Sequence, residues 1–334
     1  MVFLTLFLML IVILVAAEIF TNALEHLGEK LGISEGVTGS LFAAVGTALP
    51  ETSVPLLAIF AGTANAHTNH EIGVGAILGA PLMLATLSIF LMALSVYKAR
   101  GAKGHLRPER TGLKRDLNYF IFAFVVAAIA LYVPHESTAI RIAIGLGMIL
   151  IYVVYVAQTL SSSKALVADG HATEADEPMF LNKVGIPTNG YTIFLQIILG
   201  LALLIAGAKG FIGGVEEAAS ILGISTLLLS LLIIPIATEL PEKVNSILWI
   251  RKGKDTLAFG NITGAMVFQG TLLPAIGIML TPWQAQSEVV IGFVITLIAA
   301  VWLRVMAQMG QLQVWHIAVN GLLYISYLVL VLTK

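Results

Sequence analysis

The sequence predicts an all-α membrane protein with ten transmembrane helices, arranged as two inverted-topology repeats of five, in which helices 2 and 7 are interrupted. Three observations predict this fold class: the composition, the number of long apolar segments and an internal repeat. Of the 334 residues, 58% are hydrophobic and only 11% are charged, whereas soluble globular proteins carry about 25% charged residues. Most of the surface must therefore face lipid, and the bilayer is the first expected partner.

The apolar segments come first, because a helix needs about 20 predominantly apolar residues to cross the hydrocarbon core. The first segment has no basic region before it and no small-residue cleavage pattern, so we expect a transmembrane helix and not a signal peptide. The chain offers ten such segments: 2–24, 36–61, 71–97, 117–133, 137–160, 189–212, 225–250, 256–280, 287–305 and 312–333.

A polar stretch near the middle of the chain divides these segments into two groups. Residues 161–187 are rich in serine and in charges of both signs, which is typical of a solvated linker. We therefore expect a first five-helix repeat in 1–160, a linker in 161–187 and a second five-helix repeat in 188–334.

Lysine and arginine mark one side of this ten-helix arrangement. They concentrate in the loops 98–115 and 251–254, whereas the loops 62–70 and 281–287 contain neither residue. Loops rich in Lys and Arg stay in the cytoplasm. The basic loops and the linker are therefore predicted to be cytoplasmic, in a protein integral to the cell membrane with both termini outside.

The internal repeat covers the second helix of each group. The stretch "LGISEGVTGSLFAAVGTALPE" begins at Leu31, and "LGISTLLLSLLIIPIATELPE" begins 191 residues later at Leu222. Downstream, "GAILGA" from Gly75 resembles "GNITGA" from Gly260. Four positions coincide at the first offset: Thr47 with Thr238, Leu49 with Leu240, Pro50 with Pro241 and Glu51 with Glu242.

Five helices in each repeat place the second repeat in the membrane upside down relative to the first. Inverted repeats of this kind are found in secondary transporters, whose binding sites lie near the midplane at interrupted helices. The interruption is the T-x-L-P-E motif, because proline lacks a backbone donor and clashes with the preceding turn. The freed carbonyl groups are tolerated at membrane depth only where they face protein or a cavity.

The motifs resemble those of the cation/Ca2+ exchanger superfamily, which includes the sodium/calcium exchangers. That superfamily carries a G-T-S-L-P-E-like motif on helices 2 and 7 and a G-N-x-x-G-S-N/D-like motif on helices 3 and 8. The resemblance implies an ion site between these four helices. It assigns the paired carboxylates to Glu51 and Glu242, further oxygens to Thr47 and Thr238, and a place near the site to Asn261.

Four positions depart from the superfamily pattern. The serine of G-T-S-L-P-E is Ala48 in the first repeat and Glu239 in the second. The Asn or Asp of the second motif is Pro81 in the first repeat and Met266 in the second. Two polar ligands and one hydroxyl are absent, and one carboxylate is added on helix 7. The identity of the transported ion is therefore less defined than the fold.

The chemistry of the predicted site suits a hard cation. Ca2+ takes six to eight oxygen ligands, and Glu51, Glu239 and Glu242 can supply carboxylates. Glu239 and Glu242 share a face only if the helix continues through Pro241, so Glu239 either binds the ion or faces away from it. The amides of Asn245 and Gln269 are secondary candidates.

Buried carboxylates without a cation take up protons, so either Na+ or H+ can be the counter-ion. We expect a secondary antiporter that exchanges Ca2+ for Na+ or H+, with the transported cations as its ligands. We expect no cofactor, no enzymatic activity and no nucleic-acid partner. The alternatives are an exchanger-like transporter for another cation or solute, and a non-transporting membrane subunit. Glu25 and Glu216 are expected at helix ends in water, with the mouths of an ion pathway as the alternative.

Overall fold

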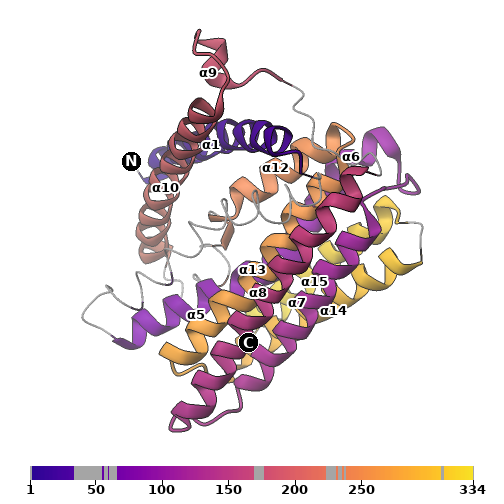
Figure 1. The fold of residues 1–334 in the computed structure, drawn as a ribbon. Coiled ribbons are helices and arrows are strands. Elements are labelled where there is room, and N and C mark those ends of the chain that lie inside the picture. Colours follow the sequence, from indigo (N-terminus) through magenta and orange to yellow (C-terminus); the bar gives the residue numbers. More distant parts are fainter. Residues whose placement is uncertain are drawn as a thin grey trace.

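The structure is a computed structural model that describes residues 2–33, 55, 59, 66–168, 177–222, 231, 235–236, 238–309 and 312–333. Within these ranges the regular elements are helices, together with one isolated antiparallel bridge between His105 and Gln313. The helices are α1 (Val2–Leu31), α5 (Ala66–Met83), the π-helix η2 (Leu84–Ser88), α6 (Ile89–Arg100), α7 (Arg110–Ala130), α8 (Thr138–Ala168), α9 (Phe180–Lys183), α10 (Gly190–Leu222), α12 (Leu240–Arg251), α13 (Asp255–Leu280), α14 (Ser287–Gln308) and α15 (Val314–Leu332). The predicted all-α class is confirmed for the described part of the chain (Figure 1).

Six helices in the described part are long and apolar enough to cross a membrane. They are Gly73–Arg100, Thr138–Ser162, Gly190–Gly207, Asp255–Leu280, Ser287–Gln308 and Val314–Val331. Helices α1 and α7 correspond to two further predicted spans, and α12 forms the end of the predicted span 225–250. The predicted span 36–61 lies outside the described residues, except at positions 55 and 59.

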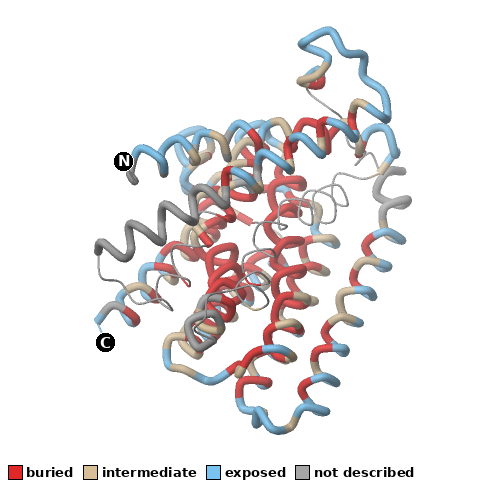
Figure 2. Tube along the Cα trace, turned by 90° about the vertical axis from the view of Figure 1, so that its left-hand side faces the viewer, coloured by how far each residue is buried: buried red, intermediate tan, exposed pale blue. Residues whose placement is uncertain are grey.

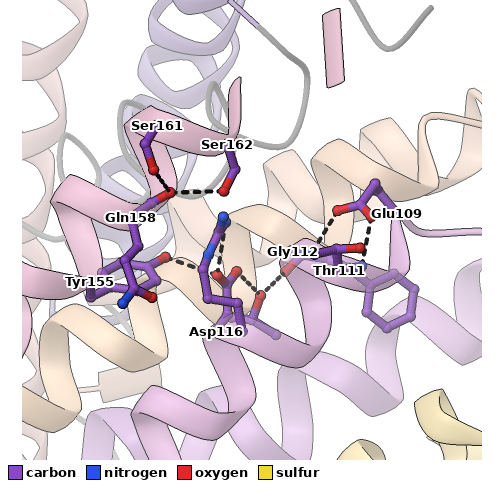
Figure 3. A network of polar contacts seen from close by, with 11 residues as sticks. Glu109, Thr111, Gly112, Asp116, Tyr155, Gln158, Ser161 and Ser162 are labelled. Atoms are coloured by element: carbon purple, nitrogen blue, oxygen red, sulfur yellow. Dashed lines mark hydrogen bonds and ion pairs between the residues drawn. The ribbon is translucent and has the colours of Figure 1, made fainter. Parts of the chain in front are cut away.

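Several helices, among them α7 and α8, extend beyond the apolar segments that predicted them. Helix α7 begins at Arg110, seven residues before the predicted span, because the Glu109 carboxylate accepts hydrogen bonds from the backbone N–H groups of Thr111 and Gly112 at 2.6 and 2.5 Å (Figure 3). A side chain that caps the first turn in this way stabilises a helix start. Helix α8 continues to Ala168, so the first eight residues of the predicted linker 161–187 are helical.

Helix α13 forms the centre of the molecule. In its most apolar window 83% of the residues are buried, against 22% in the corresponding window of α8. Figure 2 shows the buried residues gathered in the middle of the helical bundle and exposed residues along its outer helices. On the outer helix α8, Leu146, Leu150 and Val153 are 58%, 61% and 55% exposed. An apolar stripe at this spacing, exposed on the outside of the protein, is the surface expected against lipid.

Helices α1 and α10 lie side by side at one edge of the molecule (Figure 1). They approach closely at Gly200, where a Cβ atom would meet the backbone of Phe20 at 3.0 Å. Small residues permit such contacts between membrane helices. Since α1 and α10 are the first helices of the two predicted repeats, the equivalent helices pair with each other.

The remaining helices of each predicted repeat pack across the centre onto the other repeat. Helices α7 and α8 contact α13, whereas α14 and α15 contact α5, η2 and α6. The fourth and fifth spans of each predicted repeat thus cover the third span of the other.

Contacts between loops gather the basic segments at one end of the bundle. Arg100, at the end of α6, donates to both carboxylate oxygens of Asp255 at 2.8 Å and to the carbonyl of Ile250 at 2.7 Å. The basic loops 98–115 and 251–254 therefore lie together at this end. At the opposite end Arg141 donates to the carbonyl groups of Thr281 and Pro282.

The expectation for Glu25 was wrong. Glu25 is only 5% exposed, at the basic end of the bundle. Its carboxylate accepts a hydrogen bond from the Trp249 indole and lies 3.8 Å from the Lys254 ammonium. Packing of α1 against α12 brings Trp249 to Glu25. A helix end assigned from the sequence alone does not predict this contact between helices. The side chain of Glu216 lies outside the described residues.

Candidate functional site

The second T-x-L-P-E motif forms a buried turn at the start of α12. Helical residues precede it, a turn occurs at Glu239, and α12 begins at Leu240. Pro241 occupies the first turn of α12, where a missing N–H costs little because the first backbone donors of a helix have no helical acceptor. Thr238, Glu239 and Glu242 are 2%, 0% and 0% exposed.

The distortion at this motif is short. The N–H of Glu239 donates to the Pro235 carbonyl at 3.0 Å, and the N–H of Lys243 donates to the Glu239 carbonyl at 3.1 Å. Helical hydrogen bonds therefore lie on both sides of the turn. As a result, side chains four residues apart across Pro241 project from the same face.

Helix α5 contacts this region through the first repeat's second motif. At Gly79 of "GAILGA", a Cβ atom would stand 2.4 Å from the Leu231 carbonyl oxygen and 2.6 Å from Cγ of Pro235. Only glycine permits this approach, since the nearest atom belongs to the backbone. The second motif of the first half thus lies against the residues that lead into the first motif of the second half.

Helix α13 brings Asn261 to the same turn. The Asn261 amide donates to the Glu242 carbonyl at 3.0 Å and to the Ser246 hydroxyl at 2.9 Å, and its side chain is fully buried. Of the predicted site residues, Thr238, Glu239 and Glu242 are gathered in one turn, and Asn261 is joined to it. Thr47 and Glu51 lie outside the described residues.

Two further amides near the motif are buried. Asn245 follows Glu242 by three residues, and Gln269 lies two helical turns beyond Asn261; both are 0% exposed. Within the part of the chain that the structure describes, neither side chain has a hydrogen-bond partner, and the Asn261 carbonyl oxygen also has none. Burying a polar group without a partner is costly, which makes these amides candidates for contact with a bound ion.

Sequence reasoning missed Lys243. Its ammonium lies 2.9 Å from a carboxylate oxygen of Glu239 and 3.3 Å from the Pro235 carbonyl oxygen, and the residue is only 4% exposed. The signal was present in the sequence, because Lys243 directly follows Glu242 and stands four residues after Glu239.

Among the described residues, no group of three His, Cys, Asp or Glu side chains could hold a metal ion.

Two of the four departures from the superfamily pattern are buried in the helices that flank the turn. Pro81, within α5, and Met266, within α13, are both buried. The π-helix η2 begins three residues after Pro81. In η2 the carbonyl of Ala85 accepts a hydrogen bond from the Asn320 amide at 2.6 Å, so this carbonyl already has a protein donor. Helix α13 remains continuous through Pro274.

A second polar cluster supports α13 near the site. Asp116 of α7 is 1% exposed and accepts hydrogen bonds from the Tyr155 hydroxyl at 3.1 Å and the Thr263 hydroxyl at 2.8 Å. Figure 3 shows Tyr155 and Asp116 pointing toward each other from α8 and α7. Because Thr263 stands two residues after Asn261, this cluster holds the part of α13 that reaches the turn.

Comparison with known proteins identifies similar chains along nearly the whole length. The family model described as "Sodium/calcium exchanger protein" matches residues 1–160 and 192–333. CaxA of Alkalimonas amylolytica, which is named as a candidate antiporter, is 25% identical over 279 residues that cover 82% of this chain and 79% of CaxA.

Two solved structures share the fold. The sodium-calcium exchanger NCX_Mj, soaked with 100 mM Na+ and 10 mM Sr2+, matches with a TM-score of 0.72 at 19% identity and covers 98% of each chain. The H+/Ca2+ exchanger CAX matches with a TM-score of 0.73 at 14% identity, over 98% of this chain and 82% of CAX.

Proposed function

Because the chain belongs to the sodium/calcium exchanger protein family, within the cation/Ca2+ exchanger superfamily, we propose that it is a secondary antiporter that exchanges Ca2+ for Na+ or H+ by alternating access. It is an integral membrane protein of a transporter family, not of an enzyme family. The observation that carries the proposal is the buried turn at Glu242, which Asn261 joins from α13.

The proposed architecture has ten spans in two inverted halves, 1–160 and 188–334. Two features support it: the offset of 191 residues between the T-x-L-P-E motifs, and the reciprocal packing of α7 and α8 on α13 and of α14 and α15 on α5, η2 and α6. In this arrangement the motif turns of the two halves face each other near the membrane midplane.

The proposed ion site contains the carboxylates Glu51 and Glu242, with oxygens from Thr47 and Thr238 and with Asn261 beside them. Glu239 can add one oxygen, because Lys243 holds its other oxygen. Carboxylates at membrane depth are expensive and mark ion pathways in transporters. Two at symmetric positions are the simplest set that binds either a divalent cation or protons.

The counter-ion is either Na+ or H+. NCX_Mj is named as a sodium-calcium exchanger and CAX as an H+/Ca2+ exchanger, and this chain shares the fold of both. Pro81 and Met266 have no side-chain oxygen, so two oxygen ligands that further Na+ sites would need are absent. This slightly favours H+ as the counter-ion.

The test is radioactive Ca2+ flux into proteoliposomes that contain the purified protein. Uptake should require an outward Na+ gradient or a proton gradient, and the gradient that drives it identifies the counter-ion. Glu242→Gln and Glu51→Gln should each abolish uptake, because an uncharged amide replaces a ligand carboxylate. Glu136→Gln, in the exposed loop between α7 and α8, is the matched control and should transport normally. Unchanged flux in Glu51→Gln or Glu242→Gln would remove that residue from the proposed site.

The second candidate is an exchanger-like transporter for another cation or solute. The apolar side chains of Pro81 and Met266, buried beside the turn, favour it. Calorimetric titration with Ca2+, Mn2+ and Na+ separates the two candidates. Micromolar Ca2+ binding that Glu242→Gln abolishes supports the exchanger, whereas tight binding of Mn2+ alone supports the alternative.

A further inference from the structure

The ion pair between Glu239 and Lys243 is the least expected feature of the turn. Both residues are at least 96% buried, and the ammonium and carboxylate groups are 2.9 Å apart. The ammonium also donates to the Pro235 carbonyl, so it is held inside the turn and not at its edge. Glu242, the proposed ligand, lies between the two partners in the sequence.

Stability does not account for this pair. The free energy lost when two charges leave water usually exceeds the free energy gained from their attraction. Replacing a buried ion pair with apolar residues therefore often leaves protein stability unchanged or raises it. Ionisable residues at membrane depth are functional by default. The pair therefore needs an explanation in terms of the ion site.

The pair is confined to one half of the molecule. At the offset of 191 residues, the first-half counterparts of Glu239 and Lys243 are Ala48 and Thr52. The second half thus gains an anion and a cation together. The proposed site then contains three carboxylates, those of Glu51, Glu239 and Glu242, and one ammonium.

We propose that Lys243 is a permanent, tethered cation of the transport site and occupies the position at Glu239 that a monovalent cation would otherwise take. This inference rests on the proposed function. With the ammonium in place, the three negative carboxylates and the positive Lys243 together have two negative charges, which one divalent cation neutralises. Because a tethered group has a high effective concentration, Na+ in solution competes poorly with it for Glu239. The exchanger consequently binds one monovalent cation fewer than the same site without lysine.

The test is direct Na+ binding, measured with radioactive Na+ on purified protein in detergent, which requires no Ca2+ transport. In Lys243→Met, Glu239 loses its partner and should bind Na+ saturably, roughly tenfold to a hundredfold more tightly than the wild type, as expected for removing a neighbouring unit charge. The double variant Glu239→Ala/Lys243→Thr, which places the first-half residues in the turn, should lose the added site and bind Na+ as the wild type does.

Flux in proteoliposomes provides the second measurement. Lys243→Met should show uptake that depends on one more monovalent cation per Ca2+ than uptake by the wild type or the double variant. Equal Na+ binding in the wild type, Lys243→Met and the double variant, with all three monodisperse, would overturn the inference and leave a structural ion pair. If Lys243→Met is not monodisperse, Lys243→Gln, with an uncharged polar side chain of similar length, takes its place.

These outcomes are separable from failure of the proposed function. If the wild type transports no Ca2+ but Lys243→Met gains Na+ binding, the inference about Lys243 holds and Ca2+ exchange is wrong. If the wild type exchanges Ca2+ but Lys243→Met gains no Na+ site, exchange holds and the inference is wrong.

Discussion

At the scale of single residues, the sequence predicted some of the side chains at the turn before α12 and missed one of them. Glu242 and Asn261 were predicted from motif and repeat, and the structure places their backbone and side-chain groups 3.0 Å apart. Lys243 was missed because its pairing with Glu239 depends on helical hydrogen bonds that continue on both sides of Pro241. The proline in the motif predicts that the helix is interrupted, but the length of the interruption is known only from the structure.

Asn261 provides a test at this scale. Asn261→Ala leaves the Glu242 carbonyl and the Ser246 hydroxyl without their donor. Buried groups left without a partner cost about 1–3 kcal/mol, so we expect a lower unfolding temperature in detergent as well as weaker cation binding. Asn182→Ala, on the exposed helix α9, should change stability by less than about 0.5 kcal/mol. Equal unfolding temperatures in the two variants would contradict this role of Asn261.

At the scale of the elements, hydropathy predicted the apolar centre of each helix but not its polar ends. Helix α7 starts earlier because of the Glu109 cap. Helix α8 continues past Leu160, where the hydroxyls of Ser161 and Ser162 donate back to the Gln158 carbonyl at 2.9 Å (Figure 3). Serine and glutamate lower an apolar score although their side chains bond to the backbone of these helices, so a scale based on burial in lipid does not extend the helices over them.

Close packing of α5 against the residues before α12 makes a prediction at the scale of elements. Gly79→Ala places a methyl group 2.4 Å from the Leu231 carbonyl oxygen, and the backbones must separate. We expect a loss of about 1–3 kcal/mol of stability. We also expect reduced transport, because α5 packs against the residues that lead into the turn.

Gly147→Ala is the matched control, because no atom lies within 4 Å of the position where its Cβ would stand. A glycine in a helix is about 1 kcal/mol less favourable than alanine. Gly147→Ala should therefore leave transport unchanged and maintain or raise the unfolding temperature. A Gly79→Ala protein as stable and active as Gly147→Ala would show that the close approach is not required.

At the scale of the whole molecule, the sequence repeat proposes which helices are equivalent but does not predict which of them pack together. An offset of 191 residues relates sequence positions; it carries no information on which spans touch. The packing of α7 and α8 on α13, and of α14 and α15 on α5, η2 and α6, is known only from the structure. The pairing of α1 with α10 is likewise visible only in the structure.

Sidedness can be tested on the whole molecule, because the chain contains no cysteine and every introduced thiol is unique. Lys103→Cys and Gly253→Cys lie in the two basic loops, and His135→Cys and Gln284→Cys lie at the opposite end. In intact cells a membrane-impermeant maleimide should label the second pair and spare the first. Labelling of Lys103→Cys and Gly253→Cys from outside would reverse the proposed orientation, and labelling of one residue from each pair would reject the ten-span arrangement.

The contact between Arg100 and Asp255 has a consequence for the biosynthesis of the protein. The two residues are separated by 155 positions, so the ribosome completes Arg100 long before its partner exists. At about 5–20 residues per second, roughly 8–30 s pass between them. During that time Arg100 lacks its acceptors on Ile250 and Asp255, because neither residue has been synthesised. If the proposed halves complete one another during membrane insertion, two separately expressed halves should become resistant to degradation only when both are synthesised in the same cell.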